Sequence, residues 1–209
     1  MMAGFRMIAM ALQLVGSARS RVSIPRWYAE EKGIPYTWVQ LDGQAGEHRQ
    51  PPFLALNPFG KMPALVDDGF SGPDGQPLRL FESGAILLHL AEHHGGEFGS
   101  DPAVAAVRRS LSAQWILYAN STFATALLQA ANREEDLLRQ LAVLDGLLAA
   151  GPLLGEAAGW GAADCAVQAY LSYLPLFCAQ VNLDPFPAVR ACIAVTSARE
   201  AWQRVAGSR

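Results

Sequence analysis

The apolar positions follow two different patterns along the chain, and the change falls near residue 95. Before it, short continuous or alternating apolar runs predict four strands. These strands are Ile8–Val15, Tyr36–Leu41, Ala64–Asp67 and Leu78–Phe81. A helix between the first two ends at Gly33, and a second follows Ser83 and stops at Gly95-Gly96. This order predicts a small sheet covered by helices.

After Asp101-Pro102, a typical helix start, the periodicity is helical only. The apolar stripes are Val104, Val107, Leu111, Trp115 and Tyr118, then Leu137, Leu141, Leu144 and Leu148, then Ala166, Tyr170, Tyr173 and Phe177. We therefore expect an α/β domain over residues 1–95, a linker over 96–101 and an all-helical domain over 102–209.

Composition narrows the class of protein. The chain has 209 residues, 51% hydrophobic and 17% charged, which excludes disorder. A chain of this size buries about 70% of its surface without metals or disulfides. The net charge of −3 argues against a nucleic-acid partner. The three cysteines fit no disulfide framework or metal knuckle, so we expect small core residues in a reducing cytoplasm.

The N-terminus has a second interpretation. Arg6, the apolar run 7–15 and the small residues 16–18 imitate a secretory signal peptide. The run is too short to span a membrane, and it also fits the first buried strand. Because cleavage would delete that strand, we expect a cytoplasmic protein with no membrane partner.

The stretch 57–66, NPFGKMPALV, carries the most chemical information. Pro63 at the start of a strand donates no ladder hydrogen bond, and we expect a cis Met62–Pro63 peptide. The Met62 backbone would then pair with a peptide-like ligand as an added strand.

Glu82-Ser83-Gly84 places a carboxylate and a hydroxyl at a helix N-terminus. Such a position suits the two ends of an amino acid, because Glu82 takes the ammonium while Ser83 and the helix N–H groups take the carboxylate. A plain helix cap is the alternative.

Together, the two stretches resemble the glutathione-site signature of the glutathione transferase family. The run 44–51 (QAGEHRQP), with Gly16, Arg19-Ser20-Arg21 and Trp27-Tyr28, is most similar to bacterial and cyanobacterial members of the chi class. The resemblance covers nearly the whole chain. It implies a thioredoxin-like domain followed by a helical bundle, glutathione as co-substrate and a homodimer.

The resemblance also implies roles for individual residues. His48 and Lys61 would hold the glycine carboxylate of glutathione, although His48 also fits a solvated surface position. Met62, next to Pro63, would pair with the cysteinyl residue. Glu82 and Ser83 would bind the γ-glutamyl end.

The residue that activates the glutathione thiol is less defined. Ser17, Ser20 and Ser23 compete near the first helix, with Arg19 as a nearby cation. Ser20 occupies the position that carries the activating residue in cysteine- and serine-type members, and we favour it. Pro25 complicates this choice, because a helix that began at Ser20 would lose a hydrogen bond there. The serines could also be caps only.

Three further features modify the picture. Residues 68–77 form a longer hairpin loop than the family's tight turn. The family's helix-capping Ser or Thr is replaced by Gly161, three residues before Asp164. Trp115 and Tyr118, with Phe123, could line an electrophile pocket, although their spacing also fits core packing.

His89-Leu90-Ala91-Glu92-His93 matches the H-x-x-E-H pattern of a class of zinc proteases. No third ligand follows in the sequence, so we expect no metal.

These features predict a glutathione transferase that joins the glutathione thiolate to small apolar electrophiles in detoxification. One alternative is a glutathione-dependent isomerase or dehalogenase of the same fold. Another is a noncatalytic module that keeps the fold to bind a partner.

Overall fold

A computed structural model describes residues 12–206 and contains one four-stranded mixed sheet in the order β2-β1-β3-β4. The strands are β1 (Leu12–Gly16), β2 (Thr37–Gln40), β3 (Ala64–Ser71) and β4 (Pro77–Phe81). β1 pairs parallel to β2 and antiparallel to β3, and β3 pairs antiparallel to β4. The predicted strands are confirmed in type and order, although residues 8–11 lie outside the described part of the chain. β3 runs four residues beyond the predicted end, so the hairpin loop is shorter than expected.

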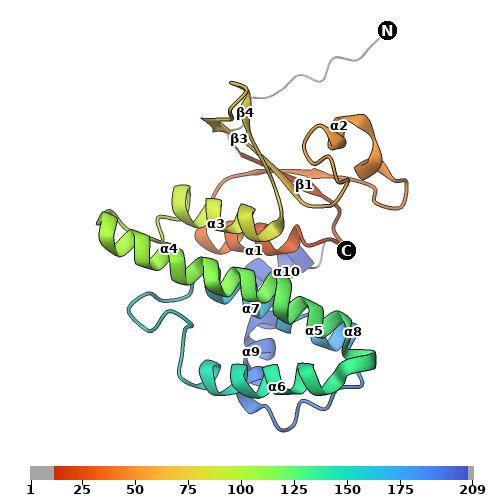
Figure 1. Ribbon diagram of the computed structural model, residues 1–209, viewed down its shortest axis with the longest axis vertical. Coiled ribbons are helices and arrows are strands. Elements are labelled where there is room, and N and C mark those ends of the chain that lie inside the picture. Colours follow the sequence, from red (N-terminus) through yellow and green to blue (C-terminus); the bar gives the residue numbers. More distant parts are fainter. Residues whose placement is uncertain (1–11, 207–209) are drawn as a thin grey trace.

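Helices cover both faces of the sheet. α1 (Ser23–Lys32) and α3 (Ser83–His93) lie between the sheet and the helical half of the chain (Figure 1). The short α2 (Pro51–Leu54), which follows a 3₁₀ turn at Glu47–Arg49, places Phe53 against Val15 and Ala64 on the other face. This arrangement is a thioredoxin-like domain.

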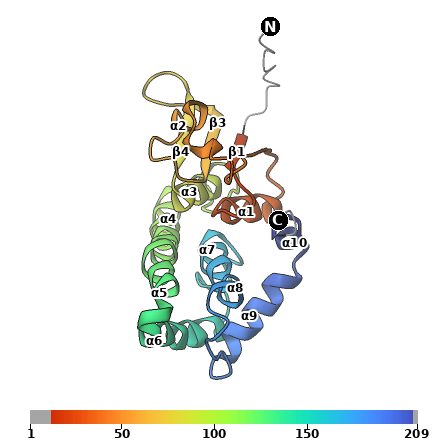
Figure 2. The same cartoon turned by 90° about the vertical axis from the view of Figure 1, so that its right-hand side faces the viewer.

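The second half is entirely helical within the described residues (Figure 2). Its helices are α4 (Pro102–Leu117), the π-helical turn η2 (Tyr118–Phe123), α5 (Ala124–Leu128), α6 (Ala130–Ala149), α7 (Ala162–Leu171), α8 (Leu174–Phe177), α9 (Pro187–Ala198) and α10 (Glu200–Ala206). The Asp101 side chain caps α4 by accepting hydrogen bonds from the N–H groups of Ala103 and Val104. In the described region, no helix combines the length and apolarity needed to cross a bilayer.

One continuous core joins the two halves through α1. All residues from Ser23 to Ala29 are buried. Trp27 packs edge-on against Trp160 and Trp202 of the helical half, with ring centroids 5.1 and 5.0 Å away. Fully burying a large apolar side chain contributes about 1.5–3 kcal/mol. Separating the two halves would therefore cost at least this free energy at Trp27.

The cysteines are free thiols, and Cys165 and Cys178 are buried in this core, as expected from the sequence. Burial raises the pKa of the Cys165 thiol well above its ordinary value.

Glu97, between the two halves, supplies the helix cap that the sequence lacks at Gly161. Its carboxylate accepts hydrogen bonds from the Tyr28 hydroxyl at 2.8 Å and the Ala162 N–H at 3.0 Å. Asp164 accepts a further bond from the Gly161 N–H at 3.1 Å. A Cβ at position 161 would overlap the Glu97 carboxylate. Glycine at this position therefore makes room for a cap that comes from a distant part of the chain.

We expect Glu97→Ala to lower the free energy of unfolding by about 2–4 kcal/mol, because the buried Tyr28 hydroxyl and the Ala162 N–H each lose a partner at about 1–3 kcal/mol per group. Urea titration measures the change. Glu92→Ala is the matched control, since its ion pair with Arg109 is partly exposed and contributes at most about 1 kcal/mol. Equal losses in the two variants would contradict the capping role.

Candidate functional site

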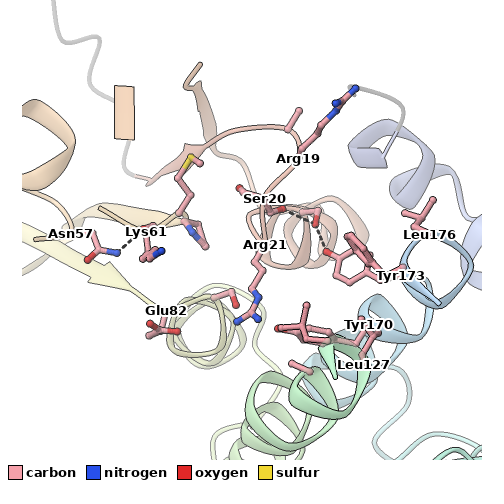
Figure 3. Close-up of a pocket in the computed structure, with 18 residues that line it drawn as sticks. Arg19, Ser20, Arg21, Asn57, Lys61, Glu82, Leu127, Tyr170, Tyr173 and Leu176 are labelled. Atoms are coloured by element: carbon pink, nitrogen blue, oxygen red, sulfur yellow. Dashed lines mark hydrogen bonds between the residues drawn. The ribbon is translucent and has the colours of Figure 1, made fainter. Parts of the chain in front are cut away.

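A pocket of about 760 Å³ opens between the sheet end of the first half and the helical half (Figure 3). Its wall is formed by three groups of residues from separate parts of the sequence. They are Ala18, Arg19, Ser20, Arg21 and Ser23; then Asn57, Lys61, Met62, Pro63, Glu82 and Ser83; then Ala124, Leu127, Leu128, Tyr170, Tyr173, Leu176 and Phe177. The first two groups contain all the charged side chains of the lining, and the third is mainly apolar.

Asn57 holds the loop that leads into β3. It is buried; its amide donates to the Lys61 carbonyl at 2.6 Å, and its oxygen accepts from the Phe59 N–H at 3.1 Å. The Met62–Pro63 peptide is cis, as predicted. The Met62 sulfur accepts a hydrogen bond from the Ser17 N–H at 3.1 Å. Within the described chain, no backbone hydrogen bond occupies Met62, so its N–H and C=O are available to a ligand.

Glu82 has a strained backbone, with a φ of 68°. A non-glycine residue in this region costs of the order of 1–3 kcal/mol and is typical of functional sites. The conformation starts α3 immediately afterwards and leaves the exposed Glu82 carboxylate at the pocket wall.

Asn120, in the turn η2, ties Ser83 to the helical half. Its side-chain oxygen accepts hydrogen bonds from the Ser83 hydroxyl at 2.8 Å and the Tyr170 hydroxyl at 3.0 Å, while its amide donates to the Ile116 carbonyl. A Cβ on Gly84 would lie 2.8 Å from the Ile116 side chain, so glycine permits this close approach. Burial raises the pKa of the Tyr170 phenol well above its ordinary range, which keeps it a neutral donor.

Pro25 is compatible with the observed start of α1. α1 begins at Ser23, so Pro25 falls in the first turn, where helical N–H groups have no intrahelical partner. The Ser20 hydroxyl donates to the Ser17 carbonyl at 2.8 Å and accepts from the Val22 N–H at 3.3 Å. The Ser23 hydroxyl shares a 2.7 Å hydrogen bond with the Tyr173 hydroxyl. Ser20 is thus the serine with a pocket-facing position and no contact to the helical half.

Three cations line the pocket, and they differ in orientation. In Figure 3, Arg21 extends toward Tyr170 and Glu82, whereas Arg19 points away from the other labelled side chains. The Arg21 guanidinium carbon lies 5.6 Å from the centre of the Tyr170 ring. Lys61 is exposed on the loop side. The pocket can therefore balance more than one anionic group.

Sequence reasoning missed the apolar wall and Arg21. Tyr170, Tyr173 and Phe177 were recognised only as a helical stripe, and Leu127 and Leu176 carried no signal. The two tyrosines were the available clue, since buried tyrosines require partners for their hydroxyls.

Some expected site residues lie elsewhere. Ser17 and His48 are outside the pocket lining; His48 is in the 3₁₀ turn, and its Nδ1 is buried with no partner among the described residues. Trp115 and Tyr118 line a separate cavity of about 560 Å³ beside α6. Residues 68–77 also do not reach the pocket.

Residues 10–92 match the family model described as the glutathione S-transferase N-terminal domain. The match covers less than half of the chain, so it shows that this segment is similar to that domain. With the helical half that follows it, the described chain has the glutathione transferase fold, as the sequence predicted.

Individual relatives differ in function. A glutathione transferase from Burkholderia graminis, solved with two glutathione molecules bound per subunit, is 28% identical with a TM-score of 0.74, over 94% of this chain and 88% of that one. The disulfide-bond oxidoreductase YfcG of Escherichia coli is 38% identical over 44% of this chain and 40% of its own length. The transcriptional regulator URE2 of Saccharomyces cerevisiae is 43% identical over 34% of this chain and 18% of its own length. The chain thus matches less than half of each of these two curated relatives.

We expect Asn120→Ala to lower the free energy of unfolding by about 2–3 kcal/mol, because the hydroxyls of Ser83 and Tyr170 lose their shared acceptor. Asn132→Ala, an exposed asparagine in α6, is the control and should change stability by less than about 0.5 kcal/mol. Denaturant unfolding followed by tryptophan fluorescence measures both. An unchanged free energy of unfolding in Asn120→Ala would show that the shared acceptor does not hold the halves together.

Proposed function

We propose that this protein binds glutathione in the pocket and transfers its thiolate to small apolar electrophiles. One observation carries the proposal. A single cavity joins the loop of Met62, the strained Glu82 and the segment before α1 to an apolar wall of the helical half. Polar groups for a peptide and apolar groups for a second substrate therefore face the same space.

The chemistry of the wall suits each part of glutathione. The Glu82 carboxylate pairs with the γ-glutamyl ammonium, while Ser83 and the α3 N-terminus take the adjoining carboxylate. The unoccupied backbone of Met62 pairs with the cysteinyl residue. Lys61 balances the glycine carboxylate, and His48, in the 3₁₀ turn outside the lining, is its proposed partner there.

Activation of the glutathione thiol requires only a modest electrostatic stabilisation of the thiolate. A thiol with a pKa near 8.5 is only about 3% ionised at pH 7, and lowering the pKa by about two units takes about 2.7 kcal/mol. A hydrogen bond to the anion supplies about 1.5–3 kcal/mol, and a helix N-terminus adds about 0.3–1. Ser20 supplies the hydrogen bond when its hydroxyl turns from the Ser17 carbonyl toward the pocket. The Arg21 cation is the rival activator.

The electrophile occupies the side of Leu127, Leu176 and Phe177. These side chains carry no charge, and Leu176 and Phe177 are 55% and 64% exposed, so a bound apolar group would cover apolar surface there. Trp115 and Tyr118 have no part in this assignment, because they line the other cavity.

Thiol–disulfide exchange is the second candidate, and the cations favour it. Arg21 and Arg19 add to Lys61, and a glutathione disulfide has twice the carboxylates of glutathione. Among the residues that the structure describes, no cysteine lines the pocket, so the attacking thiolate must come from glutathione. That thiolate forms a new S–S bond with one sulfur of the disulfide and releases the other as a thiolate. The YfcG relative is a disulfide-bond oxidoreductase by name.

Other parts of the proposal rest on the resemblance. Val104, Val107 and Leu111 form an exposed apolar face on α4, which suits a homodimer. The chi-class assignment, a role in detoxification and a cytoplasmic location belong to the same proposal. The similarity to URE2, which is a transcriptional regulator by name, supports the alternative of a noncatalytic module.

The deciding experiment combines binding with a substrate panel. Retention on immobilised glutathione tests binding; aryl halides and isothiocyanates test conjugation, and a mixed disulfide of glutathione tests exchange. Conjugation without exchange supports the proposal, and exchange alone supports the second candidate. Binding without turnover of any compound would support the noncatalytic module.

Glu82→Ala should weaken glutathione binding by about 2–5 kcal/mol, because the ligand's ammonium loses its carboxylate partner. Isothermal titration calorimetry measures the affinity, and circular dichroism checks the fold. Glu134→Ala, an exposed glutamate on α6, is the control and should bind normally. Unchanged affinity in Glu82→Ala would remove Glu82 from the site.

Ser20→Ala should raise the pKa of the bound thiol by about 1–2 units, which equals the loss of a hydrogen bond to a charged group. The pH–rate curve then moves to higher pH, while glutathione affinity changes little, because its anchors lie elsewhere. Titration of thiolate absorbance in the ultraviolet measures the shift.

The same titration in Ser17→Ala, Ser23→Ala, Arg19→Gln and Arg21→Gln tests the rivals. A shift in one of these variants, with Ser20→Ala unmoved, would transfer the role to that residue. No shift in any of them would leave activation to the backbone N–H groups.

A further inference from the structure

Three side chains that the proposed reaction does not use converge at the far end of α3. They are Asp67 on β3, His89 in the last turns of α3 and His94 just after it. The sequence pattern H-x-x-E-H had paired His89 with Glu92 and His93 and lacked a further ligand. In the structure His93 is exposed and Glu92 pairs with Arg109, while β3 supplies a carboxylate that the sequence order conceals.

The ligand atoms lie close together. The Nε2 atoms of His89 and His94 are 2.8 and 2.7 Å from the same oxygen of Asp67, and all three ligand atoms lie within 4.8 Å of one another. Asp67 is fully buried and His89 nearly so, whereas His94 is 22% exposed and opens the cluster to solvent. The Phe70 ring covers the group, 5.2 Å from the His89 ring and 6.3 Å from the His94 ring.

We propose that Asp67, His89 and His94 bind a divalent transition-metal ion, with zinc as the preferred occupant. Two imidazole nitrogens and one carboxylate oxygen are ligands that Zn²⁺ accepts with a water in the fourth position, whereas Mg²⁺ and Ca²⁺ prefer oxygen ligands only. No ion is present in the structure.

The required rearrangement is small. Zinc bonds of about 2.0–2.1 Å in a tetrahedron hold ligand atoms about 3.3–3.5 Å apart, so each imidazole retreats from Asp67 by about 0.6–0.8 Å. The metal takes the Nε2 lone pair of each ring, so a bound imidazole carries its proton on Nδ1.

The site is separate from the pocket. It shares no residue with the pocket lining, and the 11 residues of α3 separate the two by about 15 Å along the helix. A bound ion would fasten β3 to the end of α3 and so couple metal binding to stability, and its detection requires no enzymatic assay.

The experiment uses untagged full-length protein, dialysed against a chelator and titrated with ZnSO₄ by calorimetry and with CoCl₂ by visible absorption. We expect one ion per chain, a visible ligand-field spectrum with cobalt and a rise in the unfolding temperature with zinc. His94→Gln should weaken zinc binding by at least about 100-fold, since losing even a hydrogen-bonding partner of a ligand costs about 10- to 100-fold.

His48→Gln is the matched control, because this histidine lies in the 3₁₀ turn, outside the cluster, and it should bind as the parent does. His93→Gln tests the sequence motif: the His93 ring packs 4.8 Å from the His89 ring but supplies no ligand atom to the cluster. Asp67→Asn is a second ligand variant, which keeps a hydrogen-bond acceptor for the imidazoles while weakening the metal site.

Two results would overturn the proposal. Equal zinc binding by the parent, His94→Gln and Asp67→Asn would place the ion elsewhere on the surface. Absence of stoichiometric binding in the parent, with His94→Gln less stable whether or not zinc is added, would show that the cluster is a hydrogen-bonded clamp.

Discussion

Burial of α1 between the sheet and the helical half is the constraint on which the rest of the structure depends. Because Trp27 and Tyr28 are both fully buried, the helix needs a partner on each side, and neither half can supply both. Polar interactions also hold α1 at this interface: Glu31 forms an ion pair with Arg199, and the Tyr28 hydroxyl donates a hydrogen bond to Glu97. The first half is therefore not a free domain with an attached bundle, and the two share one core.

The shared core explains why the pocket forms where it does. The N-terminal end of α1 emerges from the core beside the start of α3, with the helical half on the third side. Asn120 then connects Ser83 to Tyr170 across the junction, so an anchor on one half is oriented by the other. A change in how the halves pack would alter the polar and the apolar walls of the pocket together.

The sequence predicted the features that local signals encode. The positions of the strands along the chain, the α4 cap at Asp101 and the cis peptide before Pro63 all follow from nearby residues. It could not place the Glu97 carboxylate at Gly161, since that cap comes from a distant segment. The same limit applies to the cluster of Asp67, His89 and His94, because the helix pattern could not show the carboxylate that β3 supplies. Side-chain partners from another element leave no local signal.

The Ser20 hydroxyl has two hydrogen-bond partners in its own turn. Its hydroxyl proton is held by the neutral Ser17 carbonyl, and its oxygen receives the Val22 N–H. A bound thiolate would compete for that proton, and a charge-assisted hydrogen bond is about twice as strong as a neutral one. In the proposed mechanism, this difference favours the thiolate and leaves the Val22 bond intact, so the turn that starts α1 would keep its shape. Arg21, which stacks near Tyr170, can add its charge without moving the backbone. Activation by Ser20 thus requires one hydroxyl rotation, on a segment that buried α1 already fixes.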